Sequence, residues 1–546
     1  MKRIFLPALL MTACFISNAQ SKKTKAKADK ITTTNLHAHI EYLASDALEG
    51  RRTGTPGELK AMEYIKDQFA KYNLVPAGTE GYVQEFDVNE GLKINEEENS
   101  FIINDSSLWL RQEFFPLSFS ANGVVKGTAS PLLNEEGQPW FFNVADMLDA
   151  NKSNPHFDMM AALKTEIIRM AGAGAKAVIV YNSSSITSNI LFNKNDSGTV
   201  VSIPVVYLDE VVAKKYFSDA ASIFDINIKV NLTKDLRKAH NVIGYINNNA
   251  GATVIIGAHF DHLGYGEDGN SLDGQGQIHN GADDNASGTA ALIEMARLLQ
   301  KSPAKNNNYL FIAFSGEELG LLGSKYWLQN ETIKIIPNYM INMDMVGRYD
   351  TAHKLTIGGY GTSPTWGEVF KTVTDKNLIV HFDSSGTGPS DHASFYRKDM
   401  PVLFFFTNSH SDYHKATDDA DKINYTGETE IIDYINQIIE AVNYNGHLAF
   451  LKTREQEMRS VSLPVTLGVM PDYAFTGTGM RIDGVSKGKT AERIGLKAGD
   501  VLLQLGEYKF VDVQTYMGVL QKFKKGDKTQ LHILRDGKEM IFDVQF

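Results

Sequence analysis

Cysteine is almost absent from this chain. Its 546 residues include one cysteine, Cys14, which lies in a short apolar stretch at the N-terminus. If that stretch is cleaved off, the remaining chain has no disulfide bond and no thiolate chemistry. Its stability must then come from packed cores and bound metals.

Two other features are missing. After the N-terminal stretch, no apolar run reaches the ~18 residues that cross a bilayer, so we expect no transmembrane segment. The formal net charge is −11, and the charged residues are interspersed rather than grouped in blocks of one sign. This pattern argues against nucleic acid as a partner.

The length exceeds what one core supports, so several folded units are expected.

Residues 1–19 are predicted to be a secretory signal peptide. Lys2 and Arg3 precede a short apolar core, and residues 17–19 (Ser-Asn-Ala) suit a cleavage site. We therefore expect a secreted or periplasmic protein. The alternative is a lipid anchor at Cys14, because residues 10–14 loosely resemble a bacterial lipobox.

The next segments are predicted from composition and spacing. Residues 20–34 are rich in Lys and Thr and are typical of a linker. Residues 35–107 begin an α/β unit with two helices around the Gly-rich turn 49–57. The arginines of this turn, Arg51 and Arg52, either bind substrate or belong to a solvated turn, and the composition favours the turn.

Residues 108–238 form an insert of short strands and turns without acidic or histidine pairs at ligand spacing. Residues 175–181 and 203–207 resemble the protease-associated domain that is inserted in several peptidase families. The resemblance implies a β-rich domain that acts as a lid or positions substrate.

Residues 239–452 continue the α/β unit, and residues 453–463 form a charged linker. The apolar runs predict a mixed, mainly parallel sheet flanked by helices. Residues 241–246 and 253–258 can pair as a hairpin across the Asn-rich residues 247–251.

Metal-binding side chains follow the apolar strands of this unit. They are His259, one or both of Asp283 and Asp284, the pair Glu317-Glu318, Asp344, and His414 in a later loop. Ligands gather at the carboxyl ends of strands in an open α/β sheet. Taken singly, each has an ordinary explanation, such as a helix N-cap for an aspartate. Together, adjacent charges directly after a buried strand are costly unless cations are bound, and the residue types suit zinc.

The chemistry of hydrolysis explains these residue types. Two ions roughly 3.5–4 Å apart can stabilise both oxygens of the transition state, and Asp283 or Asp284 suits the bridging position. Glu317, beside the ligand Glu318, suits a general base that passes a proton to the leaving amine. Asp261 is placed to accept the second N–H of His259. The nearby His262, His279, His392 and His410 are not predicted to be ligands, while Asp391 and His392 are candidates for lining the pocket.

The motifs at residues 257–261, 281–288, 315–320, 343–345 and 413–414 together resemble the secreted co-catalytic dizinc aminopeptidases of the aminopeptidase S and aminopeptidase Y family. The resemblance covers residues 40–451. It implies a zinc exopeptidase fold and two Zn²⁺ ions bridged by Asp283. It places His259 and Asp344 on one zinc, and Glu318 and His414 on the other. Tyr413 would polarise the scissile carbonyl.

The function implied is release of N-terminal residues from peptides by a dizinc-bound hydroxide, with Glu317 as general base. The alternatives are a carboxypeptidase or a glutaminyl cyclase on the same scaffold, or a catalytically dead binding protein.

Residues 464–546 form a small β-rich unit. Residues 495–505 closely resemble the matching stretch of bacterial PDZ domains. PDZ domains bind an extended C-terminal peptide by β-augmentation, with loop amides holding its carboxylate. Residues 467–470 would be that loop. The alternative is a structural module without a ligand.

Overall fold

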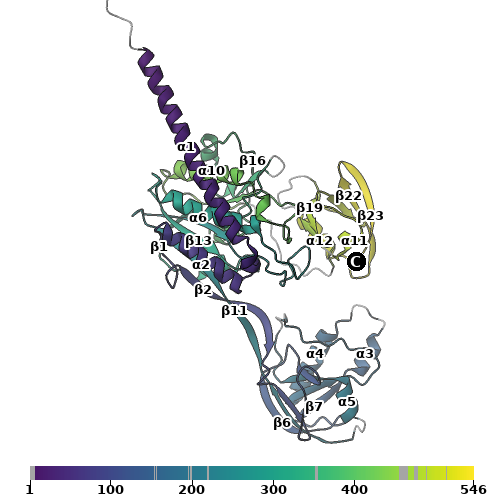
Figure 1. Ribbon diagram of the computed structural model, residues 1–546. Helices are drawn as coiled ribbons and strands as arrows, with labels where there is room; N and C mark the ends of the chain where they lie inside the picture. Colours follow the sequence, from purple (N-terminus) through teal and green to yellow (C-terminus); the bar gives the residue numbers. More distant parts are fainter. Residues whose placement is uncertain are drawn as a thin grey trace, which may run out of the picture. The chain divides into compact units, whose positions relative to one another are not determined.

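The computed structural model describes residues 7–546 apart from residues 153, 155–156, 195, 197–198, 218–220, 351–353, 454–464, 472–477, 487 and 512 (Figure 1). The chain divides into two compact units. One contains residues 1–86 and 238–546, and the other contains residues 87–237. The predicted linker at 453–463 lies almost wholly outside the described residues.

A nine-stranded mixed sheet forms the centre of the first unit, which confirms the predicted fold class. Strands β13, β12, β14 and β17 run parallel in this order, whereas β11 is antiparallel to β13, and β15 is antiparallel to β17. The bounds are β1 (Val75–Pro76), β2 (Val83–Ile94), β11 (Leu232–Ile246), β12 (Thr253–His259), β13 (Asn308–Phe314), β14 (Pro337–Met343), β15 (Leu355–Gly358), β16 (Val380–Phe382) and β17 (Val402–Phe406).

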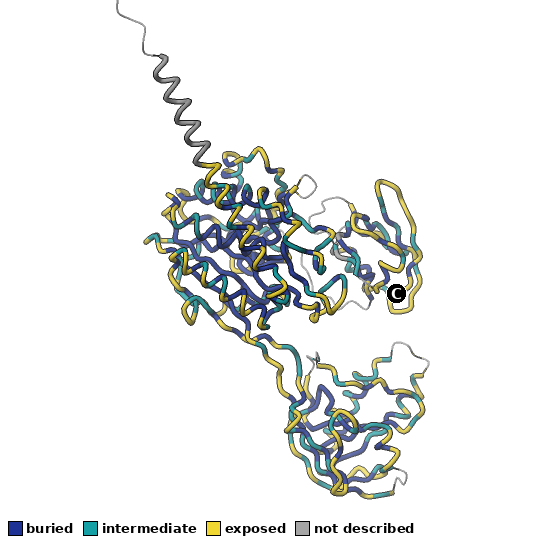
Figure 2. The backbone as a smooth tube through the Cα atoms, viewed as in Figure 1, coloured by how far each residue is buried: buried dark blue, intermediate teal, exposed yellow. Residues whose placement is uncertain are grey.

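The predicted hairpin between residues 241–246 and 253–258 is wrong. Strand β13 lies between β11 and β12 in the sheet. All seven residues of β12 are buried, as expected for a strand with parallel neighbours on both edges and helices on both faces. A hairpin at the sheet edge would leave one side of the strand open. Figure 2 shows the resulting buried centre of the unit.

Helices cover both faces of this sheet. Val254 and Ile256 of β12 pack into the larger core, together with residues of helices α1, α2, α6, α8 and α10, whereas Ile255 packs with Trp327 and Phe395 in the core on the other face. The bounds are α1 (Pro7–Leu43), α2 (Pro56–Lys71), α6 (Gly288–Leu299), α7 (Leu322–Gln329), α8 (Pro364–Thr372), α9 (His392–Tyr396) and α10 (Tyr425–Val442), with the short helices η1 (Asp46–Arg51), η2 (Ala282–Ser287), η3 (Tyr360–Thr362) and η4 (Ala420–Lys422).

The segment predicted as a linker, residues 20–34, is part of helix α1 instead. Leu36, Ile40 and Leu43 are buried at helical spacing, and the helix extends N-terminally from this packed face. Its polar residues also make contacts, because Thr33 Oγ1 lies 2.9 Å from Thr429 Oγ1. The structure does not describe the side chains of the predicted signal peptide, including that of Cys14. Among the described residues, no helix combines the length and apolarity needed to span a bilayer.

The second unit starts earlier than predicted, at residue 87 rather than 108, because residues 87–107 supply two strands to one of its sheets. One sheet has the order β4-β3-β10-β6 and the other β5-β9-β8-β7. The bounds are β3 (Ser100–Ile103), β4 (Ser106–Ser107), β5 (Phe114–Pro116), β6 (Gly123–Ala129), β7 (Pro139–Asn143), β8 (Ala177–Tyr181), β9 (Val205–Leu208), β10 (Phe224–Val230), α3 (Ala145–Asn151), α4 (Met159–Gly172) and α5 (Glu210–Tyr216).

The C-terminal residues have a sheet and a core of their own. The strand order is β18-β19-β20-β22-β23, with β21 paired to β20. Buried side chains such as Leu467, Ile482 and Leu502 form the core. The bounds are β18 (Val469–Pro471), β19 (Met480–Val485), β20 (Val501–Leu505), β21 (Tyr508–Lys509), β22 (Lys528–Arg535), β23 (Lys538–Gln545), α11 (Thr490–Arg493) and α12 (Val513–Leu520).

Candidate metal centre

The candidate metal ligands meet at one edge of the main sheet. β12 ends at His259, β13 is followed by Glu317 and Glu318, and β14 is followed by Asp344. Because β13, β12 and β14 are parallel neighbours, their carboxyl ends share this edge. The short helix η2 adds Asp284.

One cluster consists of His259, Asp284 and Asp344. His259 Nε2 lies 3.4 Å from Asp284 Oδ1 and 3.3 Å from Asp344 Oδ1. All three residues are buried. One nitrogen and two carboxylate oxygens within this distance of each other form a donor set that zinc accepts.

A second cluster uses the other oxygen of Asp284. His414 Nε2 lies 3.2 Å from Asp284 Oδ2 and 3.3 Å from Glu318 Oε2. The Asp284 carboxylate therefore lies between the two histidines, with one oxygen facing each.

The expectation that Asp283 bridges the two ions is wrong. Asp283 Oδ1 accepts hydrogen bonds from the Gly347 amide at 2.7 Å and from Ser287 Oγ at 3.1 Å. Its Oδ2 lies 3.1 Å from His410 Nε2. These protein groups occupy the Asp283 carboxylate, whereas Asp284 faces His259 and His414.

The backbone around the two aspartates explains why Asp284 faces the cluster. Asp418 Oδ2 accepts hydrogen bonds from the amides of both Asp283 and Asp284, at 2.9 and 3.0 Å. Gly281 has φ +55°, and a Cβ there would lie 2.1 Å from the Asp284 carbonyl oxygen. The turn therefore requires glycine. The turn also directs the side chains of Asp283 and Asp284 to opposite sides. Their adjacent positions in the sequence do not reveal this difference.

Each cluster histidine is oriented by a main-chain carbonyl. His414 Nδ1 donates to the Asn270 carbonyl at 2.9 Å, and His259 Nδ1 donates to the Asp261 carbonyl at 3.2 Å. These bonds leave both Nε2 atoms free to bind a cation. Asp261 was predicted to accept the second N–H of His259, and it does so through its carbonyl rather than its carboxylate. The carboxylate lies farther away, with Oδ1 at 3.7 Å from His259 Nδ1.

A third histidine, His262, also lies at the second cluster. Its Nδ1 is 3.0 Å from Glu318 Oε1 and 3.9 Å from Asp284 Oδ2. Burial lowers the pKa of His262, so the ring is neutral and the proton on Nδ1 can be donated to Glu318. His262 is thus placed to orient Glu318, while His414 brings its Nε2 to both carboxylates. The group of His262, Asp284 and Glu318 also has metal-binding spacing.

The carboxylates around His259 and His414 favour positive charge at the two clusters. Burial alone would lower the pKa of His259 and His414, yet the surrounding carboxylates, chiefly Asp344 and Glu317 for His259 and Glu318 for His414, raise both pKa values well above the usual range. Without a cation, protons on these rings balance the acidic groups. Bound divalent ions would replace those protons.

Glu317 differs from its neighbour Glu318. Burial, with Asp344 and Glu318 adding, raises the pKa of Glu317 well above its usual range. Burial also opposes ionisation of Glu318, but His414 and the hydrogen bond from His262 hold its pKa well below the usual range. Glu317 Oε2 lies 3.9 Å from His259 Nε2. One carboxyl is thus suited to hold a proton and the other to remain a charged ligand.

Tyr413 stacks on His414, with ring centroids 3.9 Å apart and planes at 18°. Burial, followed by the nearby Asp284, Glu318 and Glu317, raises the pKa of Tyr413 well above its usual range. The phenol therefore stays protonated and can donate a hydrogen bond.

Other residues close to the motifs in sequence have their own contacts. His279 Nε2 lies 2.7 Å from Asp273 Oδ1, and His392 stacks on Phe404. Asp391 is fully buried next to His259 and Asp344, and burial raises its pKa to about 7. Sequence reasoning missed Asp418 as the support of the two aspartates. The only signal was its position four residues after His414.

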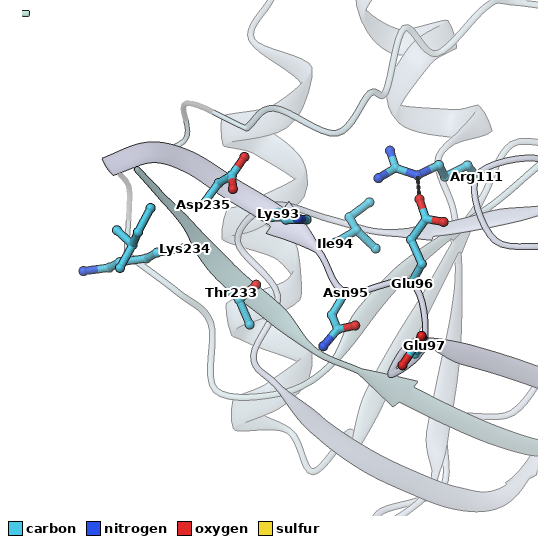
Figure 3. Close-up of a pocket in the computed structure, with 10 residues that line it drawn as sticks. Lys93, Ile94, Asn95, Glu96, Glu97, Arg111, Thr233, Lys234 and Asp235 are labelled. Atoms are coloured by element: carbon cyan, nitrogen blue, oxygen red, sulfur yellow. Dashed lines mark hydrogen bonds and ion pairs between the residues drawn. The ribbon is translucent and has the colours of Figure 1, made fainter. Parts of the chain in front are cut away.

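The insert offers a contrasting group of charges. A hollow of about 580 Å³ in this unit has six charged residues in its lining (Figure 3): Lys93, Glu96, Glu97, Arg111, Lys234 and Asp235. Arg111 Nε donates to Glu96 Oε1 at 3.0 Å, and both side chains are exposed. In the part of the chain that the structure describes, the histidine–carboxylate groups with metal-binding spacing are those at the sheet edge.

Comparison with known proteins identifies two regions. Residues 241–439 match the model of peptidase family M28, and residues 454–546 match that of the PDZ domain. Aminopeptidase YwaD of Bacillus subtilis (strain 168) is 32% identical over 234 residues, which are 41% of this chain and 46% of that protein. Leupeptin-inactivating enzyme 1 of Streptomyces exfoliatus is 33% identical over 148 residues, 26% of this chain and 32% of that enzyme.

Among solved structures, BSAP, a zinc aminopeptidase from Bacillus subtilis, is 22% identical with a TM-score of 0.41, over 78% of this chain and 96% of that one. The chain spans between about a third and a half of the length of the first curated relatives it matches. Residues 241–439 therefore carry the sequence features of peptidase family M28, and residues 454–546 carry those of a PDZ domain.

Proposed function

We propose that this chain is a secreted zinc-dependent exopeptidase, an aminopeptidase that holds two zinc ions. The observation that carries the proposal is the Asp284 carboxylate, which has one oxygen facing His259 and the other facing His414. His259, Asp344 and Asp284 would hold one ion, and His414, Glu318 and Asp284 the other. The relatives named aminopeptidases support the activity.

The donor set fits zinc. It consists of two imidazole nitrogens and three carboxylates, all buried or nearly so. Burying these carboxylates without a cation is unfavourable. Bound zinc ions act as Lewis acids that polarise a carbonyl oxygen and acidify water.

The protein's own groups provide the proton transfer. Glu317 is not needed as a ligand and its pKa is raised by burial, so it can take a proton from the attacking water and return it to the leaving amine. The protonated phenol of Tyr413 can donate a hydrogen bond to the scissile carbonyl oxygen as negative charge develops there.

The decisive experiment combines metal analysis with a substrate panel. Purified protein should bind close to two zinc ions per chain, and a chelator should abolish hydrolysis of aminoacyl amides. Peptides with an acetylated N-terminus should resist cleavage. Cleavage of acetylated peptides from the other end would identify a carboxypeptidase instead. One zinc per chain under zinc-replete conditions would favour the cyclase alternative, and two ions without hydrolysis of any peptide would favour a binding protein.

We also propose that the PDZ domain binds the C-terminus of a peptide along β18. This strand is at the end of the described sheet order, where an added strand can pair. The domain supplies none of the residues of the metal centre. Deleting residues 454–546 should leave hydrolysis of small amides unchanged and alter the cleavage of long peptides. Equal loss on both substrates would contradict this proposal.

A further inference from the structure

The turn at Gly50–Thr53 contacts the loops of the metal centre and is not explained by the ligand set. Arg51 of this turn is fully buried. Its guanidinium donates to the main-chain carbonyls of Phe260 at 2.8 Å, Asn280 at 2.7 Å and Gly281 at 3.0 Å, and also to that of Leu43. A guanidinium occupied in this way has no role in binding substrate. The expectation that Arg51 belongs to a solvated turn is also wrong.

The carbonyls bound by Arg51 belong to two loops of the metal centre. Phe260 follows His259, while Asn280 and Gly281 precede Asp284 by a few residues. One rigid, planar side chain thus spans the loops that carry these two ligands. Lysine cannot replace it, because an ammonium lacks the fixed fork of donors. Burial lowers the pKa of Arg51 to about 10, so the group stays charged at neutral pH.

The backbone of the same turn is joined to the first of these loops. The His262 amide donates to the Arg51 carbonyl at 3.2 Å, and the Gly264 amide donates to the Gly50 carbonyl at 3.0 Å. Gly50 has φ +69°, and a Cβ there would lie 2.5 Å from the His279 carbonyl oxygen. A side chain would therefore push the turn away from the centre.

Thr53 acts on the same site through Asp261. Thr53 Oγ1 donates to Asp261 Oδ2 at 2.8 Å, and the other carboxylate oxygen accepts from the Glu317 amide at 3.2 Å. Both Thr53 and Asp261 are buried. Fixing the Asp261 carboxylate thus positions the loop of Glu317, and the Asp261 carbonyl orients His259.

We propose that Arg51 and Thr53 are positioning residues of the metal centre: Arg51 sets the separation of the loops that carry His259 and Asp284, and Thr53 fixes the Asp261 carboxylate that orients Glu317. This inference rests on the function proposed above. It assigns the turn a task that does not involve contact with zinc or substrate.

The test measures zinc affinity by competition with a chelator, in variants shown to be folded by circular dichroism. Arg51→Lys should weaken zinc binding by about 10–100-fold, the range seen when groups that support metal ligands are removed. Arg297→Lys is the control, since the partly buried Arg297 donates through Nε and Nη2 to Glu294 on α6, and this variant should retain wild-type affinity. Millimolar guanidinium ion should partly restore zinc binding to Arg51→Ala.

Thr53→Val removes one hydroxyl at nearly constant volume and decides the case if the Arg51 variants do not fold. It should lower kcat about 10-fold with little change in KM and weaken zinc binding, while Thr429→Val, the control, should change neither. Wild-type zinc affinity and kcat in folded Thr53→Val or Arg51→Lys would overturn this inference. Wild-type protein that binds no zinc would instead overturn the proposed function.

Discussion

The edge of the main sheet and the hollow of the insert both collect charged side chains, but under opposite conditions. At the sheet edge, the side chains of Asp284 and Glu318 are 4% and 6% exposed. In the hollow, Arg111 and Glu96 are 53% and 69% exposed and pair with each other. Water solvates the second group, whereas the first has an excess of buried negative charge that a cation must balance. The burial and the net charge of such a group therefore say more about cation binding than the number of its charged residues does.

The largest effect is expected from removing the shared carboxylate. Asp284→Asn should lower zinc content and reduce turnover by more than the ~10²–10⁴-fold that a general acid–base group supplies, because both ions lose a charged ligand. Asp283→Asn should cost about 10–100-fold in metal affinity or activity, as for a supporting group. Zinc analysis and kcat measure both. The reverse order would restore Asp283 to the bridging position.

Replacing Glu317 comes next. Glu317→Gln keeps the shape of the side chain but removes the proton acceptor, so kcat should fall ~10²–10⁴-fold with zinc content unchanged. Glu318→Gln should lose zinc first, since a neutral amide is a poorer ligand. If Glu317→Gln loses zinc and Glu318→Gln keeps it, the two roles are exchanged.

A smaller effect concerns Glu428 on α10, a fully buried acid whose carboxyl oxygens have no hydrogen-bond partner among the described residues. Burial, with Asp283 and Glu294 adding, raises its pKa well above 4.5. The folded state therefore keeps a proton that the unfolded chain releases above about pH 4.5. This group's contribution to the free energy of unfolding falls as the pH rises towards the folded pKa, by at most about 1.4 kcal/mol per pH unit.

Glu428→Gln lacks this titration. Urea unfolding of zinc-free protein at pH 5, 6 and 7 should show the variant gaining stability relative to wild type as the pH rises. Glu368→Gln on the exposed face of α8 is the control and should show no trend. A constant difference between Glu428→Gln and wild type would contradict the assignment.

The smallest effect belongs to the hollow. Arg111→Met should change the free energy of unfolding by less than about 1 kcal/mol, because exposed ion pairs contribute little. Zinc content should not change. A large loss of stability or metal would remove the distinction between the two groups of charges.

Local patterns in the sequence predicted the strands and which residue types follow them. The buried β12, β13 and β14 each appear as an apolar run, and the side chains after them are of metal-binding types. The choice between Asp283 and Asp284 was not accessible, because it depends on the turn at Gly281 and on Asp418, a residue about 135 positions away. The same limit applies to Arg51, because three of its carbonyl partners, those of Phe260, Asn280 and Gly281, are more than 200 residues distant. Strand order in the sheet was equally hidden, since β13 separates two strands that are consecutive in the chain.

The insert leaves and rejoins the main sheet through neighbouring strands. β2 pairs with β11, and Lys238 Nζ lies 2.9 Å from Glu85 Oε1 across the two. The start and end of the inserted segment therefore lie side by side, as do the ends of a hairpin loop. In evolutionary terms, this arrangement allows a whole domain to be acquired, exchanged or deleted without shifting the register of the strands in the main sheet. For the protein engineer, it marks where a short turn could replace residues 87–237, or where a different domain could be inserted into the same unit.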